Sequence, residues 1–284
     1  MCAKKAVIVG CGVGGPVAAL LLRRAGFEPE ICEAQAGPDD YSGLFLNLAS
    51  NGLRVLDELG LAAAVSAEGF ACPRMVMWSG SGKRLGEVRN GAAPGQGAAS
   101  VIIKRAALHR VLREAAERAG VPIRWGKQLT GYDALPDGRL RVAFADGGET
   151  IADLLVGADG LHSRARRLID PAAPDPAYTG LVSCGGFAYC PGLEPTPGVQ
   201  HFIFGRKAFF GYLVKPGGET YWFNNLAYPG APRRAELEAI PDAEWRRRLL
   251  ELHAGDQPFI NEIITATEGP IGRYPIYDLP ALRR

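Results

Sequence analysis

Apolar positions in this chain follow two patterns that alternate along the sequence. One is a short uninterrupted run such as Ala6 to Val9, which is typical of a buried parallel strand. The other is the spacing of an amphipathic helix, shown by Val17 and Leu21 ahead of Gly26, which stops the helix. A second short run, Glu28 to Cys32, follows at once. The beginning of the chain is therefore predicted to form a strand, a helix and a second strand.

Further along, the apolar pattern changes in character. Helical periodicity extends from Ala106 to Ala119 and stops at Gly120. Past residue 180 the apolar runs become rich in Phe, Tyr and Trp, which predicts a mixed or antiparallel sheet. These runs are Leu181 to Cys190, Gln200 to Phe204, Ala208 to Val214 and Thr220 to Asn225.

The order of these patterns predicts an α/β fold with two domains, and a length of 284 residues favours the same number. A hairpin formed by Pro73 to Trp78 and Arg84 to Val88 leaves the alternation of strands and helices, and a strand at Thr150 to Val156 returns to it. We expect a discontinuous nucleotide-binding domain at residues 1–70 and 98–170. A second, β-rich domain would take residues 71–97 and 171–276, and residues 277–284 would lead back to the first domain.

Composition narrows the classes of partner. With 32 basic and 30 acidic side chains the net charge is only +2, so nothing in the charge balance favours a nucleic acid or a membrane surface. No apolar run approaches the roughly 18 residues of a membrane span. The first strand begins within a few residues of Met1, which leaves no room for a signal peptide. We expect a cytoplasmic protein that binds a small molecule.

Cysteine and histidine spacings give no metal site. The six cysteines contain no C-x-x-C pair, which is typical of reduced thiols in a cytosolic protein. The four histidines show no spacing of metal ligands. His201 and Tyr212 are the polar aromatic candidates for a proton-transfer role, although the sequence favours neither, and the catalytic residues stay unknown.

A glycine motif follows the first strand and carries most of the candidate chemistry. Gly10, Gly12 and Gly15 have the spacing G-x-G-x-x-G at the start of the predicted helix. Gly10 permits the tight turn, Gly12 leaves no Cβ in the path of a pyrophosphate, and Gly15 lets the helix lie close to the strand. The N-terminus of the helix then directs free N–H groups at the phosphates. Val13 and Gly14 complete this candidate phosphate loop.

An acidic residue stands where such a site needs one. Glu33 follows the second strand about 20 residues after the glycines, where a carboxylate can accept hydrogen bonds from the adenosine ribose. Ala34 is its neighbour in the candidate site, and the Gly-, Asp- and Pro-rich stretch from Ala34 to Asn47 predicts a loop over a ligand. An acid here favours FAD or NAD over NADP. The alternatives are a tight strand-to-helix turn without ligand and a solvated carboxylate.

Two further fragments suggest a family. Arg105 opens the helix that begins near Ala106, and the run LLVGADGLHSRARRL extends from Leu154 to Leu168. Together with the glycine motif, these fragments resemble the class A flavoprotein monooxygenases of the p-hydroxybenzoate hydroxylase type. In that family a D-G pair ends a strand and is followed by Ser and Arg, and the pair here is Asp159-Gly160, with Ser163 and Arg166 after it.

The resemblance implies a Rossmann-like FAD-binding domain with an inserted mixed β-sheet substrate domain, FAD as cofactor and NAD(P)H as co-substrate. It also implies that Asp159 and Gly160 hold ribose and pyrophosphate groups, with Arg166 in the same segment. Arg105 would pair with the pyrophosphate, which suits the fork of a guanidinium. Without the resemblance, Asp159-Gly160 reads as a turn and Arg105 as a surface arginine.

The chemistry that the resemblance implies is that of an oxidoreductase. NAD(P)H would reduce FAD, O2 would add at the flavin C4a, and the hydroperoxide would hydroxylate or epoxidise an aromatic or polyketide-like small molecule. The second domain would supply the pocket walls, although most of its aromatic residues are expected in the core. They are Phe187, Tyr189, Phe202, Phe210, Tyr212, Tyr221, Trp222 and Phe223.

The end of the sequence departs from the family pattern. After an R-x-P-x-x-D-L-P segment, here Arg273 to Pro280, the family continues into G-D-A-A-H, which this chain lacks. A monooxygenase truncated at this point is expected to hold the flavin ring loosely, to release peroxide and to self-associate. Two rivals stay open, a nicotinamide-dependent dehydrogenase and a non-catalytic FAD- or nucleotide-binding remnant or fragment.

Overall fold

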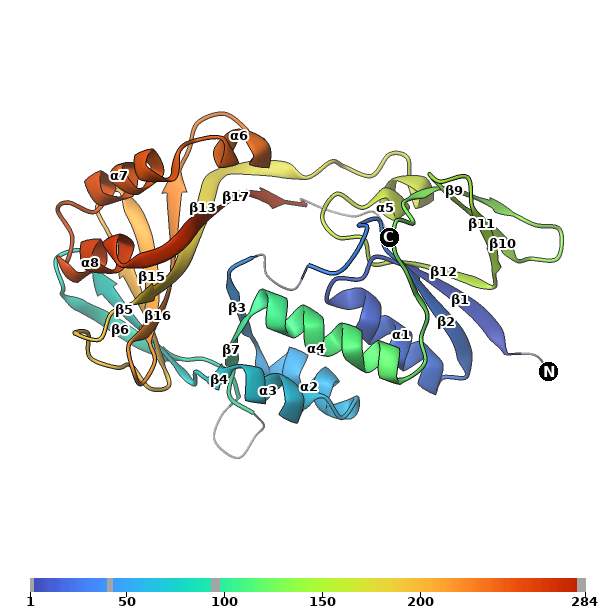
Figure 1. The fold of residues 1–284 in the computed structure, drawn as a ribbon, viewed down its shortest axis with the longest axis horizontal. Coiled ribbons are helices and arrows are strands. Elements are labelled where there is room, and N and C mark those ends of the chain that lie inside the picture. The colour runs from blue at the N-terminus through green and yellow to red at the C-terminus, as the bar shows by residue number, and fades with distance from the viewer. Residues whose placement is uncertain (1–2, 40–42, 93–97, 280–284) are drawn as a thin grey trace.

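A parallel sheet forms the nucleotide-binding side of the molecule. The computed structural model describes residues 3–39, 43–92 and 98–279, and it contains a four-stranded sheet in the order β12-β1-β2-β8 (Figure 1). Helices α1 and α4 pack against it through the buried side chains of Ile8, Ala19, Ile31 and Ala116. The predicted strand, helix and strand at the start of the chain are confirmed. The elements are β1 (Lys4–Val9), α1 (Gly14–Arg24), β2 (Phe27–Cys32), α4 (Arg105–Arg118), β8 (Ile123–Arg124) and β12 (Leu154–Gly157).

The strand predicted at Thr150 to Val156 is wrong as one element, because the structure divides it between two sheets. β11 (Glu149–Ala152) ends an antiparallel sheet with β10 (Leu140–Phe144) and β9 (Leu129–Ala134), whereas β12 pairs with β1. Asp153 marks the break, since its carboxylate accepts a hydrogen bond from the Lys5 backbone N–H at 2.7 Å. The chain therefore passes from one sheet to the other at Asp153, whose side chain is hydrogen-bonded to β1.

A small antiparallel sheet lies between the two larger parts. Its order is β3-β7-β4, and α2 and α3 pack beside it. The predicted loop from Ala34 to Asn47 is wrong at its end, because Phe45 and Leu46 contact two different hydrophobic clusters and so favour a strand. The elements are β3 (Phe45–Leu48), α2 (Ser50–Glu58), α3 (Ala62–Glu68), β4 (Phe70–Ala71) and β7 (Val101–Lys104). The parts of the expected domains at residues 1–2, 40–42, 93–97 and 280–284 lie outside the described residues.

A seven-stranded mixed sheet forms the other large part, in the order β17-β13-β16-β15-β14-β5-β6. The hairpin of β5 and β6 joins this sheet through a parallel pairing of β5 with β14, so strands far apart in the sequence share one sheet. The prediction of a mixed sheet is confirmed. Its strands are β5 (Arg74–Ser79), β6 (Arg84–Arg89), β13 (Ala177–Tyr189), β14 (Val199–Phe204), β15 (Ala208–Val214), β16 (Glu219–Ala227) and β17 (Thr267–Asp278).

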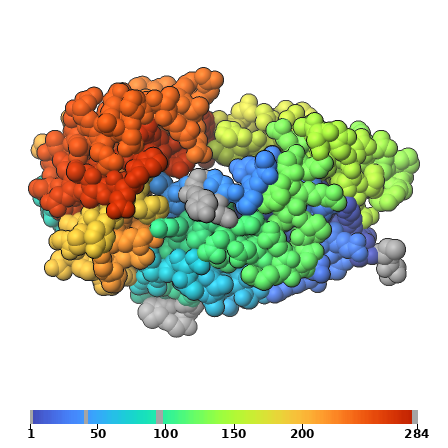
Figure 2. Space-filling model, viewed as in Figure 1, coloured from blue at the N-terminus to red at the C-terminus, as the bar shows by residue number. Residues whose placement is uncertain are grey.

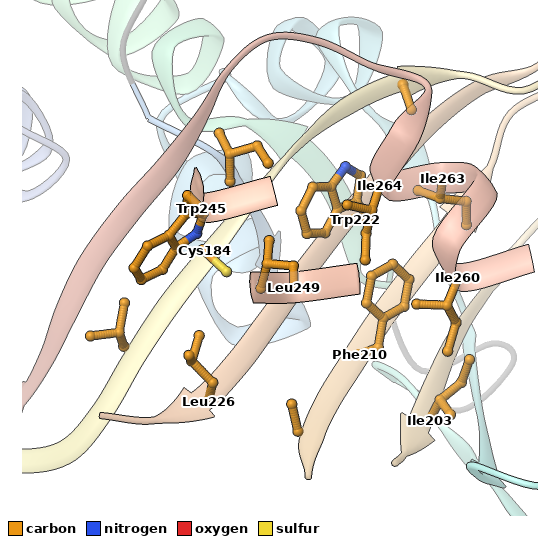
Figure 3. Packing of buried hydrophobic residues seen from close by; sticks show 14 of the residues in the cluster. Cys184, Ile203, Phe210, Trp222, Leu226, Trp245, Leu249, Ile260, Ile263 and Ile264 are labelled. Atoms are coloured by element: carbon orange, nitrogen blue, oxygen red, sulfur yellow. The ribbon is translucent and has the colours of Figure 1, made fainter. Parts of the chain in front are cut away.

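The two faces of this sheet differ in what covers them. One face, called the core face here, packs under α7 (Asp242–Leu252) and α8 (Phe259–Thr265), beside the short α6 (Arg234–Glu238) (Figure 1). Phe210, Trp222 and Trp245 are fully buried there, as Figure 3 shows. The opposite face, called the inner face, contacts the small sheet through Tyr221 and Phe45. The inner face is therefore the one turned toward the nucleotide-binding side.

Candidate functional site

The glycine loop after β1 is fixed by steric contacts. Gly10 has a φ of +104°, and a Cβ there would lie 2.4 Å from the carbonyl oxygen of Ala158. A Cβ on Gly15 would lie 1.9 Å from the carbonyl oxygen of Gly10. By contrast, a Cβ on Gly12 would meet no described atom within 4 Å. The loop thus packs tightly on two sides and leaves open space in front of Gly12, at the N-terminus of α1.

Glu33 is held at the edge of this space. One carboxylate oxygen accepts a hydrogen bond from the Cys11 backbone N–H at 2.6 Å, and the other accepts one from the Gln35 N–H at 2.9 Å. Burial, and secondarily the Glu33 charge, raise the pKa of the Cys11 thiol to about 11. The thiol therefore stays protonated at neutral pH, and Glu33 supplies the negative charge beside the glycine loop.

A cleft of about 250 Å³ connects these residues with the start of α4. Gly12, Glu33 and Arg105 all line it, although their positions in the sequence are far apart. The Arg105 Nε donates to the His109 Nε2 at 3.5 Å, which orients the guanidinium along the helix. The cleft thus combines a carboxylate, a guanidinium and a helix N-terminus, which is a donor and acceptor set suited to a nucleotide.

Several lining residues were missed by the sequence reasoning. His109 and Arg113 stand one and two turns after Arg105 on the same helix, and this i, i+4, i+8 spacing was a signal that could have found them. Trp125 and Gln35 line the cleft from the ends of β8 and β2. No local pattern marks the two residues that the seven-stranded part contributes, Arg234 and Tyr274.

The Asp159 carboxylate has a different local task. It accepts hydrogen bonds from the Ser163 hydroxyl at 2.5 Å and from the backbone N–H groups of Arg164 and Ala165 at 2.7 and 3.0 Å. These bonds cap the N-terminus of α5, which spans Arg164–Ile169. Asp159 does not line the cleft of Glu33 and Arg105, but its Cα lies 3.0 Å from where a Gly10 Cβ would stand.

Arg166 carries unsatisfied donors in the described structure. Its Nη1 donates to the Leu161 carbonyl at 2.9 Å, whereas its Nε and Nη2 are buried and have no hydrogen-bond partner among the described residues. Buried donors of this kind normally have an acceptor. Arg166 lines a pocket of about 360 Å³ together with Asp159 and Gly160, so this second motif forms its own recess.

The remaining candidates lie at the margins. Val13 and Gly14 stand at the N-terminus of α1, with Val13 38% exposed, and Gly160 has a φ of +78°. Ala34 is exposed directly after Glu33 and does not line the cleft. The structure therefore brings Gly12, Glu33 and Arg105 together and groups Asp159, Gly160 and Arg166 in the adjacent recess.

A larger cavity of about 700 Å³ adjoins the cleft and reaches the seven-stranded sheet. Both spaces share Gly43, Arg234 and Tyr274 in their linings. Figure 2 shows the two large parts on either side, with residues of the C-terminal half in orange and red and those of the N-terminal half in blue and green. The cleft therefore extends from the glycine loop to the sheet.

Glycines on paired strands shape the wall of this cavity. Gly185 of β13 pairs with Gly272 of β17, and a Cβ on either residue would lie within 3.3 Å of the Leu44 side chain. The loop before β3 can approach the sheet only because these positions lack side chains. Phe187 lines the same cavity. Leu44 and Phe187 thus give the cavity an apolar side. Charged side chains line the rest of it: Asp39, Arg234, Glu238, Asp242, Glu268 and Arg273.

His201 and Tyr212 lie away from this cavity. Both belong to the core face, where the rings stack with centroids 5.0 Å apart. The His201 Nδ1 accepts a hydrogen bond from the Trp78 Nε1 at 2.9 Å. Neither residue lines the cleft or the adjoining cavity, so their placement gives no support for the proton-transfer role considered above.

The described residues contain neither a cluster of metal ligands nor a helix that could span a membrane. Within residues 3–39, 43–92 and 98–279, no cluster of three or more His, Cys, Asp or Glu side chains could hold a metal ion. Over the same part of the chain, every helix is too short or too polar to cross a membrane.

Comparison with known proteins gives one family and several relatives. Residues 4–206 match the family described as FAD binding domain. The chain is 31% identical to 6-hydroxynicotinate 3-monooxygenase of Bordetella bronchiseptica, over 95% of this chain and 70% of that protein. It is 29% identical to the aurachin C monooxygenase/isomerase of Stigmatella aurantiaca, over 98% and 70%. It is also 32% identical to 3-amino-4-hydroxybenzoate 2-monooxygenase of Streptomyces cremeus, over 76% and 55%.

The chain is shorter than these relatives. The matched stretches span 44% to 70% of the length of four curated relatives. Among solved structures, Klebsiella pneumoniae HpxO complexed with FAD and uric acid superposes with a TM-score of 0.83 at 23% identity, over 98% of this chain and 69% of that one. CtdE in complex with FAD and its substrate gives a TM-score of 0.77 at 20% identity, over 98% and 71%. Both likenesses concern the fold, which they share with this chain.

Proposed function

Since the chain belongs to the FAD-binding family of class A flavoprotein monooxygenases, we propose that it carries FAD and oxygenates a small aromatic molecule with NAD(P)H and O2. FAD, when bound, supplies the redox chemistry: it accepts electrons from the nicotinamide and activates O2. The protein residues bind and orient the cofactor and exclude water from the reaction.

The observation that carries this proposal is the continuous space from Gly12 to the seven-stranded sheet. At one end, Gly12, Glu33 and Arg105 provide open space, a carboxylate and a guanidinium. At the other end, Leu44, Phe187 and Ile271 give the adjoining cavity an apolar side against the sheet. A dinucleotide with a flat tricyclic ring needs both ends, and a nicotinamide dehydrogenase would not need the second sheet as a wall.

The roles proposed for the cofactor-side residues follow from their chemistry. Glu33 would accept hydrogen bonds from the ribose hydroxyls, with its position fixed by the Cys11 and Gln35 N–H groups. Arg105 would pair with the pyrophosphate, which also faces the N-terminus of α1. The free donors of Arg166 make it a candidate for a second anionic or carbonyl contact beside Asp159.

Two features support an aromatic substrate. Relatives are named for 6-hydroxynicotinate and for 3-amino-4-hydroxybenzoate, both of which are small substituted rings. In this chain, the cavity next to the cofactor cleft has Phe187 and Ile271 in its lining together with the glycines. The apolar part of this lining suits the face of a flat ring, and the charged side chains beside it could hold polar substituents of that ring.

The domain organisation proposed with this function keeps the cofactor on residues 1–70 and 98–170 and the substrate wall on residues 71–97 and 171–276. In support of it, the β5–β6 hairpin belongs to the seven-stranded sheet and not to the sheet that carries β1. Residues from both groups meet in the cleft, where Arg105 and Tyr274 are both in the lining.

The substitution Gly12→Val tests the cofactor site. A branched side chain would fill the open space in front of the loop. We therefore expect the purified variant to retain about a tenth or less of the flavin that the parent retains. Gly131→Val on β9 is the matched control, because it also places a valine where no described atom lies within 4 Å, but far from the cleft in sequence and sheet. Flavin absorbance after gel filtration measures retention, and equal retention in Gly12→Val and the parent would place the site elsewhere.

Turnover tests the oxygenase activity itself. The FAD-loaded chain is supplied with NADH or NADPH in 18O2 together with 6-hydroxynicotinate, 3-amino-4-hydroxybenzoate or uric acid. We expect at least one ring to gain one labelled oxygen as the nicotinamide is consumed, with hydrogen peroxide formed beside the product. Consumption that yields hydrogen peroxide alone with every ring would contradict the proposal for this chain while leaving FAD binding intact.

A further inference from the structure

A row of four aromatic rings crosses the edge of the core face, away from the proposed cofactor cleft. Trp78 of β5 stacks on His201 of β14 with centroids 6.0 Å apart, and His201 stacks on Tyr212 of β15 at 5.0 Å. Phe259 of α8 follows at 5.1 Å from Tyr212, tilted by 54°. Four different elements thus contribute one ring each to a continuous aromatic surface.

These rings differ from the aromatic core beside them. Phe210 and Trp222 lie on the same face of the sheet and are fully buried, whereas all four rings of the row are only half-buried. Rings whose task is to fill a core are normally enclosed on all sides. The row therefore keeps part of its aromatic surface open, beside space that no protein atom fills.

That space is an open cavity of about 610 Å³, bordered by the loop at residues 192–199. His201, Tyr212 and Phe259 line it, and Arg74 stands at its margin. None of its lining residues lines the cofactor cleft or the adjoining cavity. The volume falls within the range of small-molecule sites.

The polar groups of the cavity offer hydrogen-bond donors. Because the His201 Nδ1 accepts a hydrogen bond from Trp78, the neutral ring carries its proton on Nε2, which is then a donor. Burial, together with the Arg74 charge, lowers the pKa of His201 and keeps the ring neutral. Burial also raises the pKa of Tyr212 to about 12, so its hydroxyl stays protonated, and it makes no hydrogen bond within the described part of the chain.

Arg74 adds a positive charge at the margin. One guanidinium nitrogen lies 3.4 Å from the Glu87 carboxylate, and the side chain is about half exposed. A long, exposed ion pair of this kind contributes little and leaves the other guanidinium nitrogens available. The cavity thus combines an aromatic surface, two neutral donors and the Arg74 cation, and the loop adds one acidic side chain, Glu194, to its lining.

We propose that this cavity is a second ligand site, which binds a planar aromatic molecule bearing a carboxylate or phenolic oxygen. The ligand ring would lie against Tyr212 and Phe259, and its oxygen would accept hydrogen bonds from the His201 Nε2–H and the Tyr212 hydroxyl. Arg74 would favour the ionised form of the ligand. The site is separate from the cofactor cleft, so it does not depend on the function proposed above.

Calorimetric titration of the FAD-loaded chain with 2-naphthoate tests this site. We expect saturable binding to the parent, and about tenfold weaker binding to Tyr212→Leu, because a ring contact and a hydrogen bond are lost together. His201→Phe keeps a ring and removes the donor, so binding should weaken by about three- to tenfold. Phe204→Leu is the matched control: it removes a half-exposed ring from the opposite face of β14, and binding should equal that of the parent.

Histidine ring signals in 15N NMR give a second readout that does not depend on affinity. 2-Naphthoate should shift one histidine signal of the parent, and that signal should be missing from His201→Phe. The proposal is overturned if the parent shows no saturable binding, if Tyr212→Leu and His201→Phe bind as tightly as the parent, or if Phe204→Leu weakens binding equally. Flavin content and thermal unfolding of each variant separate these outcomes from misfolding and from failure of the cofactor site.

Discussion

The two faces of the seven-stranded sheet use similar residues for different purposes. On the core face, Phe210 and Trp222 are fully buried under α7 and α8 (Figure 3). On the inner face, Phe204 is 51% exposed and Gly211 makes room for a neighbouring ring, since a Cβ there would lie 2.2 Å from Phe223. The core face is closed under α7 and α8 but open at its edge by His201 and Tyr212, whereas the inner face has an exposed ring at Phe204.

Residues that are adjacent in the sequence are divided between these faces. Phe209 contacts Phe223 on the inner face, whereas Phe210 stacks on Trp222 in the core. Side chains of a strand alternate between the faces, so neighbouring aromatic residues have opposite surroundings. An aromatic run in this sheet is therefore divided between two faces with different surroundings.

The largest effect that would sharpen this comparison is on stability. Trp222→Ala should lower the free energy of unfolding by about 3–5 kcal/mol, because it leaves a cavity in a closed core. Phe204→Ala, on the open face, should change it by no more than about 0.5 kcal/mol. Urea unfolding followed by circular dichroism measures both. Similar losses in the two variants would mean that the inner face is packed as tightly as the core.

A smaller effect concerns a buried polar network on the core face. The His253 Nδ1–H donates to Asp256 at 2.8 Å, and the His253 Nε2 accepts from the Asn224 amide at 2.6 Å. Burial lowers the pKa of His253 by more than the Asp256 carboxylate raises it. The folded chain therefore holds this ring neutral, whereas the unfolded chain binds a proton below its ordinary pKa of about 6.5.

Stability from His253 is consequently present above pH ~6.5 and is lost as the pH falls toward the lowered pKa of the folded state. Between pH 7.5 and 5.5, the parent should lose up to about 1 kcal/mol more unfolding free energy than His253→Gln, whose side chain does not titrate. Urea unfolding of both proteins at the two pH values measures the difference. The same pH dependence in both would mean that folding does not change the pKa of His253.

The smallest effect concerns an ion pair on the inner face. Lys104 lies 3.0 Å from Glu219 and 4.5 Å above the ring of Phe187, next to Arg105 in the sequence. Both charged side chains are about two-fifths exposed, so Lys104→Met should cost only about 0.5–1 kcal/mol, and 1 M NaCl should reduce that cost. Arg247→Met, which removes an exposed pair on α7, is the control and should cost less. If Lys104→Met lowered the free energy of unfolding by more than about 2 kcal/mol, this pair would be effectively buried. The inner face would then not be open at Lys104 and Glu219.

The local sequence was enough to predict the part of the candidate site formed by the glycine loop, Glu33 and Arg105. One strand–helix–strand unit contains Gly10, Gly15 and Glu33. Near neighbours in the sequence set the positive φ of Gly10, the close backbone approach at Gly15 and the place of Glu33 after the second strand. The position of Arg105 at the first turn of α4 was readable for the same reason. Apolar runs rich in Phe, Tyr and Trp also predicted the mixed sheet, because aromatic side chains are favoured in strands.

Contacts between distant segments decided the rest. Arg234 and Tyr274 enter the cleft only because β17 and α6 pack against the loop at Gly43, and no local pattern encodes that approach. Alternation predicts that Tyr212 shares a face with Phe210, but strand pairing decides that His201 joins them, and the packing of α7 and α8 decides which face is covered. Spacing along the chain fixes which side chains point the same way, whereas burial and shared cavities arise from long-range packing, so only the tertiary structure could separate the cofactor cleft from the second aromatic cavity.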